Sequence, residues 1–327
     1  MTMRLSALAT ALALIVSPAM AQKAAPKKEQ TPPPVKPNAG PGESTTGDIA
    51  YGAYQRGHYL TAFAVATKRV EETSDPVAMT LLAVLYGNGY GIPKDDTKAA
   101  EWYKIAADRG DREAMFGLAM FRISGRGGPK DRDEAARLFA AAAKLGHASA
   151  AYNLGLLYLE GVQFPQDFVR GAELFQVAAN AGSPEAQYAL ASMYKEGRGV
   201  PKDPVQATRW LAAAALADHL DALVEYAIAL HNGTGIAKDE ATATAILRKA
   251  ARRGAPIAQN RLARILATGR GAPIDAKEAV KWYIVSKAAG AKDDWLDDYA
   301  SKQTPEIRAA AQKEAEPWLF LIANSRS

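Results

Sequence analysis

The sequence predicts an all-α protein in which six copies of one helix pair follow one another along the chain. Two residue types recur every 36 positions without a slip in register. The aspartates are Asp95, Asp131, Asp167, Asp203, Asp239 and Asp275, and the glycines six positions earlier are Gly89, Gly125, Gly161, Gly197, Gly233 and Gly269. Six units in register indicate a repeat array, in which each unit packs mainly on its neighbours, rather than a domain built around one active site.

The third unit shows why each element is expected to be a helix. Its first helix carries apolar residues at 150, 154, 157 and 158, which is the spacing of one helical face. Gly161 suits the left-handed position that ends such a helix. Asp167 is predicted to begin the second helix, because its carboxylate can accept a free backbone N–H there. Gly182 ends the second helix, and Pro184 opens the next unit. The six aspartates are therefore predicted to be helix caps.

Each second helix has two adjacent large positions. The first is held by Trp102, Leu138, Leu174, Trp210, Ile246 and Trp282, and the second by Tyr103, Phe139, Phe175, Leu211, Leu247 and Tyr283. Small residues three positions before the first of these allow adjacent helices to approach closely. A closing glycine ends each unit except the fourth, where Asp218 stands instead, so we expect a local irregularity there.

The N-terminus predicts export. Residues 1–21 combine a basic start, a short apolar stretch and the small residues Ala19 and Ala21 before a cleavage site, which is typical of a secretory signal peptide. Residues 22–47 are rich in Pro, Lys and Gly and are predicted to be a disordered tether, either a plain spacer or a contact with lipid or wall polymer. No later apolar run is long enough to span a bilayer. We expect a periplasmic or secreted protein.

Composition excludes several functions. The chain has no cysteine, which rules out disulfides, thiolate metal sites and lipid attachment through an N-terminal cysteine. The formal net charge is +5, and residues 1–47 carry more than half of it. The repeat body is close to neutral, which argues against a nucleic-acid partner.

No constellation of residues indicates catalysis, a metal or a cofactor. The Gly-x-Gly segments follow helices rather than strands, so they are interpreted as turns and not as phosphate loops. The four histidines, His58, His147, His219 and His231, lie in different units without metal-ligand spacing. No nucleophile-elbow sequence is present. We expect no catalytic residue, no metal site and no enzyme.

The combined pattern resembles the Sel-one-like repeat, a relative of the tetratricopeptide repeat. Unit four carries it in Ala186, Leu190, Tyr194, Gly197, Gly199, Val200, Pro201, Asp203, Ala207 and Trp210. The resemblance covers residues 75–291, between a predicted N-terminal capping pair (48–74) and C-terminal capping helices (292–327). It implies a right-handed α-solenoid of antiparallel helix pairs whose first helices line the concave side. It also implies a scaffold or regulator of other proteins.

Alignment with the tetratricopeptide core places certain first-helix side chains on the concave groove. They are Phe116, Met120, Tyr152, Leu156, Glu160, Tyr188, Lys195, Glu196, His231, Asn232, Asn260 and Arg264. Aromatic and arginine side chains are frequent interface anchors, so this set is the predicted site for a partner protein or peptide. A small rotation of the helix would instead bury Phe116 and Tyr152 between units.

Two other functions remain open. One is an envelope factor bound to peptidoglycan or exopolysaccharide, with Tyr90, Trp102, Tyr103 and Trp210 stacking on sugars. The other is β-lactam processing, an activity associated with a cysteine-rich branch of the resembling family. This chain lacks that branch's cysteines.

Overall fold

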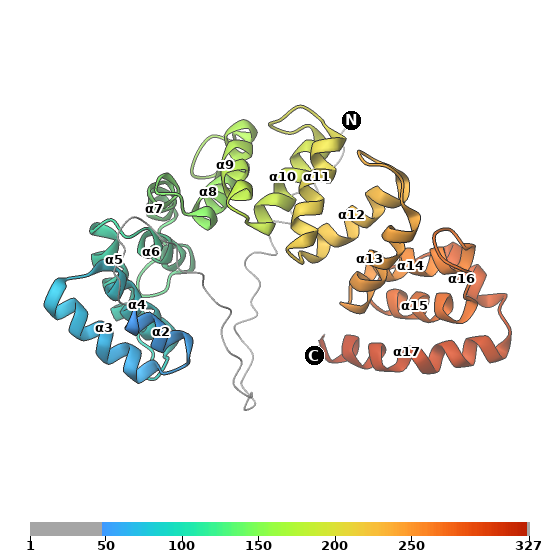
Figure 1. Cartoon of the computed structure of the whole chain (residues 1–327), viewed down its shortest axis with the longest axis horizontal. Helices are drawn as coiled ribbons and strands as arrows, with labels where there is room; N and C mark the ends of the chain where they lie inside the picture. The colour runs from blue at the N-terminus through green and yellow to red at the C-terminus, as the bar shows by residue number, and fades with distance from the viewer. Residues whose placement is uncertain (1–47, 326–327) are drawn as a thin grey trace. The chain divides into compact units, whose positions relative to one another are not determined.

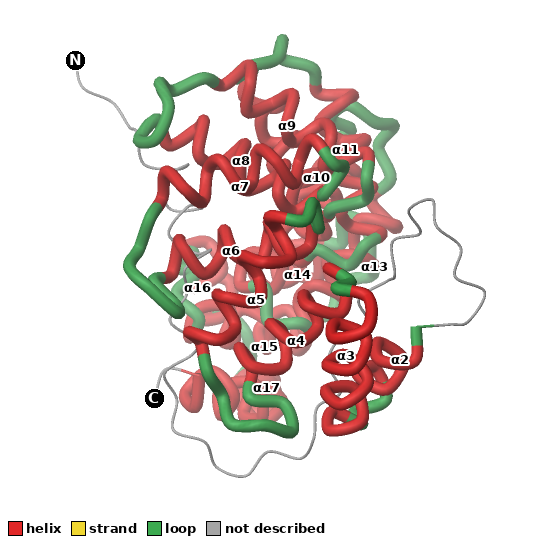
Figure 2. Tube along the Cα trace, turned by 90° about the vertical axis from the view of Figure 1, so that its left-hand side faces the viewer, coloured by secondary structure: helices red, strands yellow, loops and turns green. Residues whose placement is uncertain are grey.

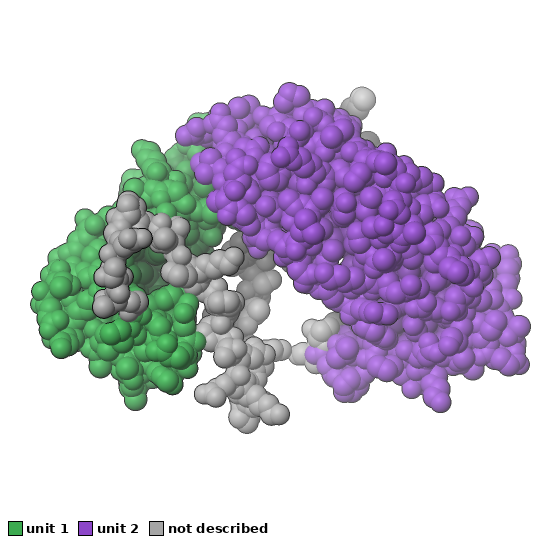
Figure 3. Space-filling model, viewed as in Figure 1, with its two compact units in different colours: residues 1–166 green, residues 167–327 purple. Residues whose placement is uncertain are grey.

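The computed structural model of this chain describes residues 48–325 (Figure 1). The predicted export signal and tether, residues 1–47, lie outside this range. The described residues form sixteen helices and no strand (Figure 2), so the all-α prediction is confirmed. The chain divides into two compact units (Figure 3): unit 1 ends at Gln166, and unit 2 begins at Asp167.

Unit 1 is a stack of helix pairs. Its helices are α2 (Ile49–Gln55), α3 (Tyr59–Thr73), α4 (Pro76–Asn88), α5 (Asp96–Asp108), α6 (Arg112–Ser124), α7 (Arg132–Lys144) and α8 (Ala148–Glu160). In the first two repeats the first helix packs on the second, α4 on α5 and α6 on α7. Each second helix also packs on the next first helix, as α5 does on α6. The N-terminal pair α2 and α3 packs on α4 in the same way.

Unit 2 continues the same plan within itself. Its helices are α9 (Phe168–Asn180), α10 (Pro184–Glu196), α11 (Pro204–Leu216), α12 (Leu220–Asn232), α13 (Glu240–Arg252), α14 (Pro256–Thr268), α15 (Ala276–Ala288), α16 (Asp294–Ser301) and α17 (Pro305–Ser325). The long helix α17 packs on α15, the last second helix of the array.

The periodic aspartates and glycines lie at helix ends. Each aspartate precedes a second helix, and its carboxylate accepts a hydrogen bond from a backbone N–H two or three residues further on. This bond satisfies one of the free donors at the helix start. Each glycine ends a first helix in the left-handed conformation, with φ between 69° and 77°. The 36-residue period of aspartate and glycine therefore marks the starts of the second helices and the ends of the first helices.

The second glycine of the Gly-x-Gly segment has a packing role. A Cβ atom built on Gly199 would lie 2.0 Å from the carbonyl oxygen of Phe168, the first residue of α9. Gly127, Gly235 and Gly271 approach the first residue of their preceding second helix in the same manner. At these positions glycine allows the loop to contact the backbone of the helix. In the third repeat the equivalent position is occupied by Gln163.

The two large positions of the second helices have different environments. The second position is buried in every repeat, in Tyr103, Phe139, Phe175, Leu211, Leu247 and Tyr283. The first position is half-buried in Trp102, Leu138, Trp210 and Ile246 and buried in Leu174 and Trp282. The second position therefore lies at the centre of the core.

Asp218 adopts the left-handed conformation of the glycine it replaces, with φ 68°. Its carbonyl oxygen accepts a hydrogen bond from Arg253 Nη1 at 2.9 Å, and its carboxylate lies 2.7 Å from Lys249 Nζ. Aspartate tolerates this backbone region better than most residues. The repeat geometry is thus retained at this position.

Candidate functional site

Several predicted groove side chains pack between neighbouring repeats. Phe116 of α6 stacks on His147, the N-cap residue of α8, with ring centroids 4.5 Å apart. Tyr188 of α10 stacks in the same way on His219 at 4.8 Å. Asn260 of α14 donates a hydrogen bond to Asp293 at 3.0 Å. This first-helix position joins one repeat to the next, which is the alternative that the sequence left open for Phe116.

Tyr188 and Lys195 meet at one carboxylate. The Tyr188 hydroxyl donates to Glu225 Oε1 and Lys195 Nζ lies 2.8 Å from Glu225 Oε2. Burial, followed by the charge of Glu225, raises the pKa of Tyr188, so the phenol stays protonated at neutral pH. Both predicted groove residues are therefore engaged by Glu225 on α12.

The other predicted residues of α6, α8 and α10 are more dispersed. Met120 is exposed, while Tyr152 and Leu156 are half-buried. Glu160 is paired with Arg132, and Glu196 lies 3.0 Å from Arg198.

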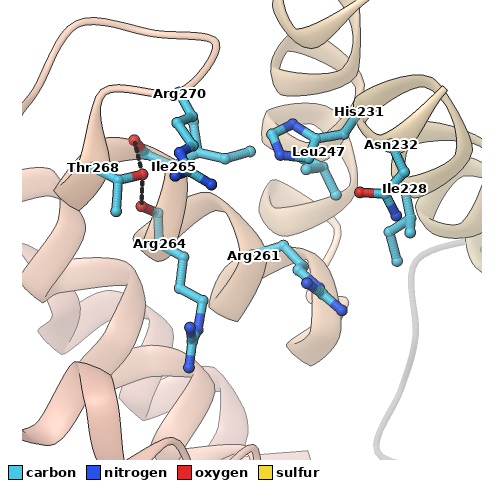
Figure 4. Close-up of a pocket in the computed structure, with 9 residues that line it drawn as sticks. All are labelled: Ile228, His231, Asn232, Leu247, Arg261, Arg264, Ile265, Thr268 and Arg270. Carbon is cyan, nitrogen blue, oxygen red and sulfur yellow. Dashed lines mark hydrogen bonds between the residues drawn. The ribbon is translucent and has the colours of Figure 1, made fainter. Parts of the chain in front are cut away.

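A cleft opens between α12 and α14 in unit 2. It has a volume of about 190 Å³, and Ile228, Leu247 and Ile265 form its apolar part. His231, Arg261, Arg264 and Arg270 supply its polar lining, together with Asn232 and Thr268. Figure 4 shows His231 and Asn232 on one side of this cleft and Arg270 on the other. We call it the α12–α14 cleft. It contains three predicted groove residues, His231, Asn232 and Arg264.

Asp293 holds one end of this site in place. Both of its carboxylate oxygens accept hydrogen bonds from Arg264, each at 2.7 Å, and one also accepts from Asn260. The same side chain caps α16 by accepting from the backbone N–H of Leu296. Arg264 also lies over the ring of Trp295, 5.2 Å from its centroid. Hydrogen bonding to Arg264 lowers the pKa of Asp293 to about 2.

This shift has a stability consequence that can be measured. Because the carboxylate of Asp293 has a depressed pKa in the folded state, it stabilises unit 2 above its ordinary pKa of 3.8, and the contribution is lost as pH falls toward about 2. We expect Asp293→Asn to lower the free energy of unfolding by ~1–2 kcal/mol at pH 6, an amount discounted because Arg264 is partly exposed.

Urea denaturation between pH 6 and pH 3 checks this expectation. The difference between the unsubstituted protein and Asp293→Asn should shrink below pH 4. Asp294→Asn removes an exposed neighbouring charge and serves as the control. A difference that stayed constant down to pH 3 would contradict the assignment.

The residues predicted from the sequence do not include Arg261, Arg270, Glu225 or Asp293. The change of charge between two equivalent positions, Glu225 and Arg261, is visible in the sequence and could have singled out both. Nothing local distinguished Asp293, whose role depends on the return of α16 toward α14.

The described residues, 48–325, were also compared with three other kinds of site: a metal site, a membrane span and a set of aromatic residues that stack on sugars. No group of three or more His, Asp or Glu side chains in this range could hold a metal ion. No helix of the described part is long and apolar enough to cross a membrane. Among the proposed sugar-stacking aromatics, Tyr103 is buried edge-on against Phe121, and Tyr90 is stacked on Tyr59 with centroids 4.7 Å apart.

Stacked helix pairs with a cleft between successive first helices define a helical repeat protein. Six consecutive segments of this chain match the Sel1 repeat: 76–111, 112–147, 148–183, 184–219, 220–254 and 256–290. The chain therefore belongs to the Sel1 repeat family, whose members generally serve as scaffolds for protein–protein interaction.

Two solved structures illustrate the similarity. A Sel1 repeat protein from Oxalobacter formigenes is 29% identical, with a TM-score of 0.65 over 73% of this chain and 98% of that chain. The protein c5321, a protective antigen of uropathogenic Escherichia coli strains with the same repeat fold, is 23% identical. Its TM-score is 0.57, over 82% of this chain and 65% of that chain. No curated protein matches the chain.

Proposed function

We propose that this protein is an exported adaptor that binds a partner protein through the first-helix face of unit 2, at the α12–α14 cleft. The observation that carries the proposal is the cleft itself, which combines an apolar floor with several cationic side chains. Pockets of this composition bind ligands by burying apolar groups while a few polar groups set orientation. Export to the periplasm is supported by residues 1–21 of the sequence.

Site-specific photo-crosslinking in cells tests the proposal. The full chain, with its own N-terminus, would carry a photoreactive phenylalanine analogue at Asn232, an exposed residue of the cleft lining. We expect a discrete protein adduct in the periplasmic fraction. The matched control places the analogue at Arg252, an exposed residue of α13 outside the cleft lining.

The two parts of the proposal fail separately. Equal adducts at both positions, or none at Asn232, would remove the cleft as the binding site. Retention of the uncleaved chain in the cytoplasmic fraction would remove export.

A further inference from the structure

Equivalent positions at successive first-helix junctions of unit 2 can be compared because the repeat period is constant. At the junction of α10 and α12, Lys195 and Tyr188 both bind the carboxylate of Glu225. One repeat further on, Lys195 corresponds to His231 and Glu225 corresponds to Arg261. The position that carries an acidic side chain at the junction of α10 and α12 therefore carries a positively charged one at the junction of α12 and α14.

Arg270 also lacks the acidic partner that the equivalent arginine of an earlier repeat has. Four repeats earlier, Arg126 lies 2.6 Å from Asp96 and also donates to the carbonyl oxygen of Gly87. The counterpart of Asp96 is Glu240, which is bonded instead to Lys238 at 2.6 Å. Arg270 forms no ion pair within the part of the chain that the structure describes, although its charge, after those of Lys238 and His231, contributes to the lowered pKa of Glu240.

The α12–α14 cleft carries positive charge that no ion pair among residues 48–325 matches. Arg264 is neutralised by Asp293 and directs its guanidinium away from His231 (Figure 4). Arg261 is exposed and, among residues 48–325, has no carboxylate partner. The Nδ1 atom of His231 is buried without a hydrogen-bond partner in this range. No acidic side chain lines the cleft.

We propose that the α12–α14 cleft takes an aspartate or glutamate side chain from an acidic segment of the partner protein. That carboxylate occupies the place that Glu225 fills one junction earlier. Arg261 and Arg270 provide charged donors for it, and arginine binds carboxylates with two parallel hydrogen bonds. Ile228, Leu247 and Ile265 accept an apolar neighbour of the acidic residue. The inference rests on the proposed function, since it names the chemistry of the partner at the same site.

The surrounding surface favours a carboxylate over a phosphate polymer. Two neighbouring cationic residues of the first helices, Lys195 on α10 and Arg264 on α14, are already paired with carboxylates of the chain itself. The cleft is small and has an apolar floor, which suits one side chain of a folded or extended peptide better than a highly hydrated polymer.

Fluorescence anisotropy with defined peptides tests the inference. The mature chain, without residues 1–21, would be titrated at low salt into labelled (Glu-Ala)₆ and (Gln-Ala)₆. We expect binding of the glutamate peptide and at least about tenfold weaker binding of the glutamine peptide, because hydrogen bonds to charged groups account for a difference of that size.

A charge reversal with a matched control locates the binding. Arg261→Glu should weaken binding of (Glu-Ala)₆ about tenfold or more. Arg252→Glu makes the same change in net charge at an exposed position of α13 and should leave the affinity within about twofold. Arg261→Glu also recreates the acid of the preceding junction beside His231. Its thermal midpoint should therefore equal or exceed that of the unsubstituted protein.

The possible results separate the alternatives. Equal binding of both peptides, or equal loss in both variants, would overturn the inference. Displacement of the peptide by inorganic phosphate, but not by free glutamate at the same ionic strength, would overturn it in favour of a phosphate-bearing ligand. If the peptide fails to bind while the Asn232 adduct still forms, the adaptor function stands and only the acidic partner is excluded.

Discussion

Replacement of Gly199 by alanine is expected to lower the free energy of unfolding of unit 2 by roughly 2–5 kcal/mol. Gly199 has φ 70°, a left-handed conformation that costs alanine energy. In addition, the new Cβ would lie 2.0 Å from the Phe168 carbonyl oxygen. Because that oxygen belongs to the backbone of α9, it cannot rotate away, and the loop or the helix has to move.

Urea denaturation followed by circular dichroism measures this loss. Gly182→Ala is the matched control, because Gly182 has φ 90° but no atom within 4 Å of its Cβ position. The control should lose only ~1–2 kcal/mol, the cost of the backbone conformation alone. Similar losses in both variants would show that the contact with α9 is not the reason for glycine at position 199.

Replacement of Phe139 by alanine is expected to destabilise unit 1 by roughly 3–5 kcal/mol. The Phe139 side chain is 1% exposed and lies in α7 against Phe116, with ring centroids 5.9 Å apart. Its removal leaves a cavity between α6 and α7 that the rigid helix pair cannot fill by collapse.

The adjacent residue provides the control. Leu138 is half-buried and packs at the margin of the neighbouring core. Leu138→Ala should cost ~1–2 kcal/mol, in line with a partly exposed aliphatic side chain. If Leu138→Ala lowered the free energy of unfolding more than Phe139→Ala, the assignment of Phe139 to the core and of Leu138 to its margin would be wrong.

The helix boundaries were predictable because they depend on short-range chemistry. An aspartate that caps a helix acts on a backbone N–H two or three residues away, and a left-handed glycine acts on its own backbone. Asp167 and Gly161 therefore carry the same information in the sequence as in the folded chain. The periodic spacing then identifies the array without any long-range contact.

The groove residues were only partly predictable. Helical spacing places Phe116, Lys195 and His231 on first helices, but it cannot distinguish a side chain that faces solvent from one that meets the next repeat. Phe116 stacks on His147, and Lys195 is held by Glu225, whereas His231 lines an open cleft. These different outcomes depend on residues about one repeat away in sequence.

Residue patterns alone thus specify the period, the helix pairs and the family resemblance, since caps, turns and apolar spacing act within a few residues. Three-dimensional packing decided which of the two large second-helix positions forms the core. It also decided which cations are neutralised, as Arg264 is by Asp293, and which have no ion-pair partner among the described residues, as is the case for Arg261. The physical reason is that burial and ion pairing depend on side chains that only the stacking of successive repeats brings together.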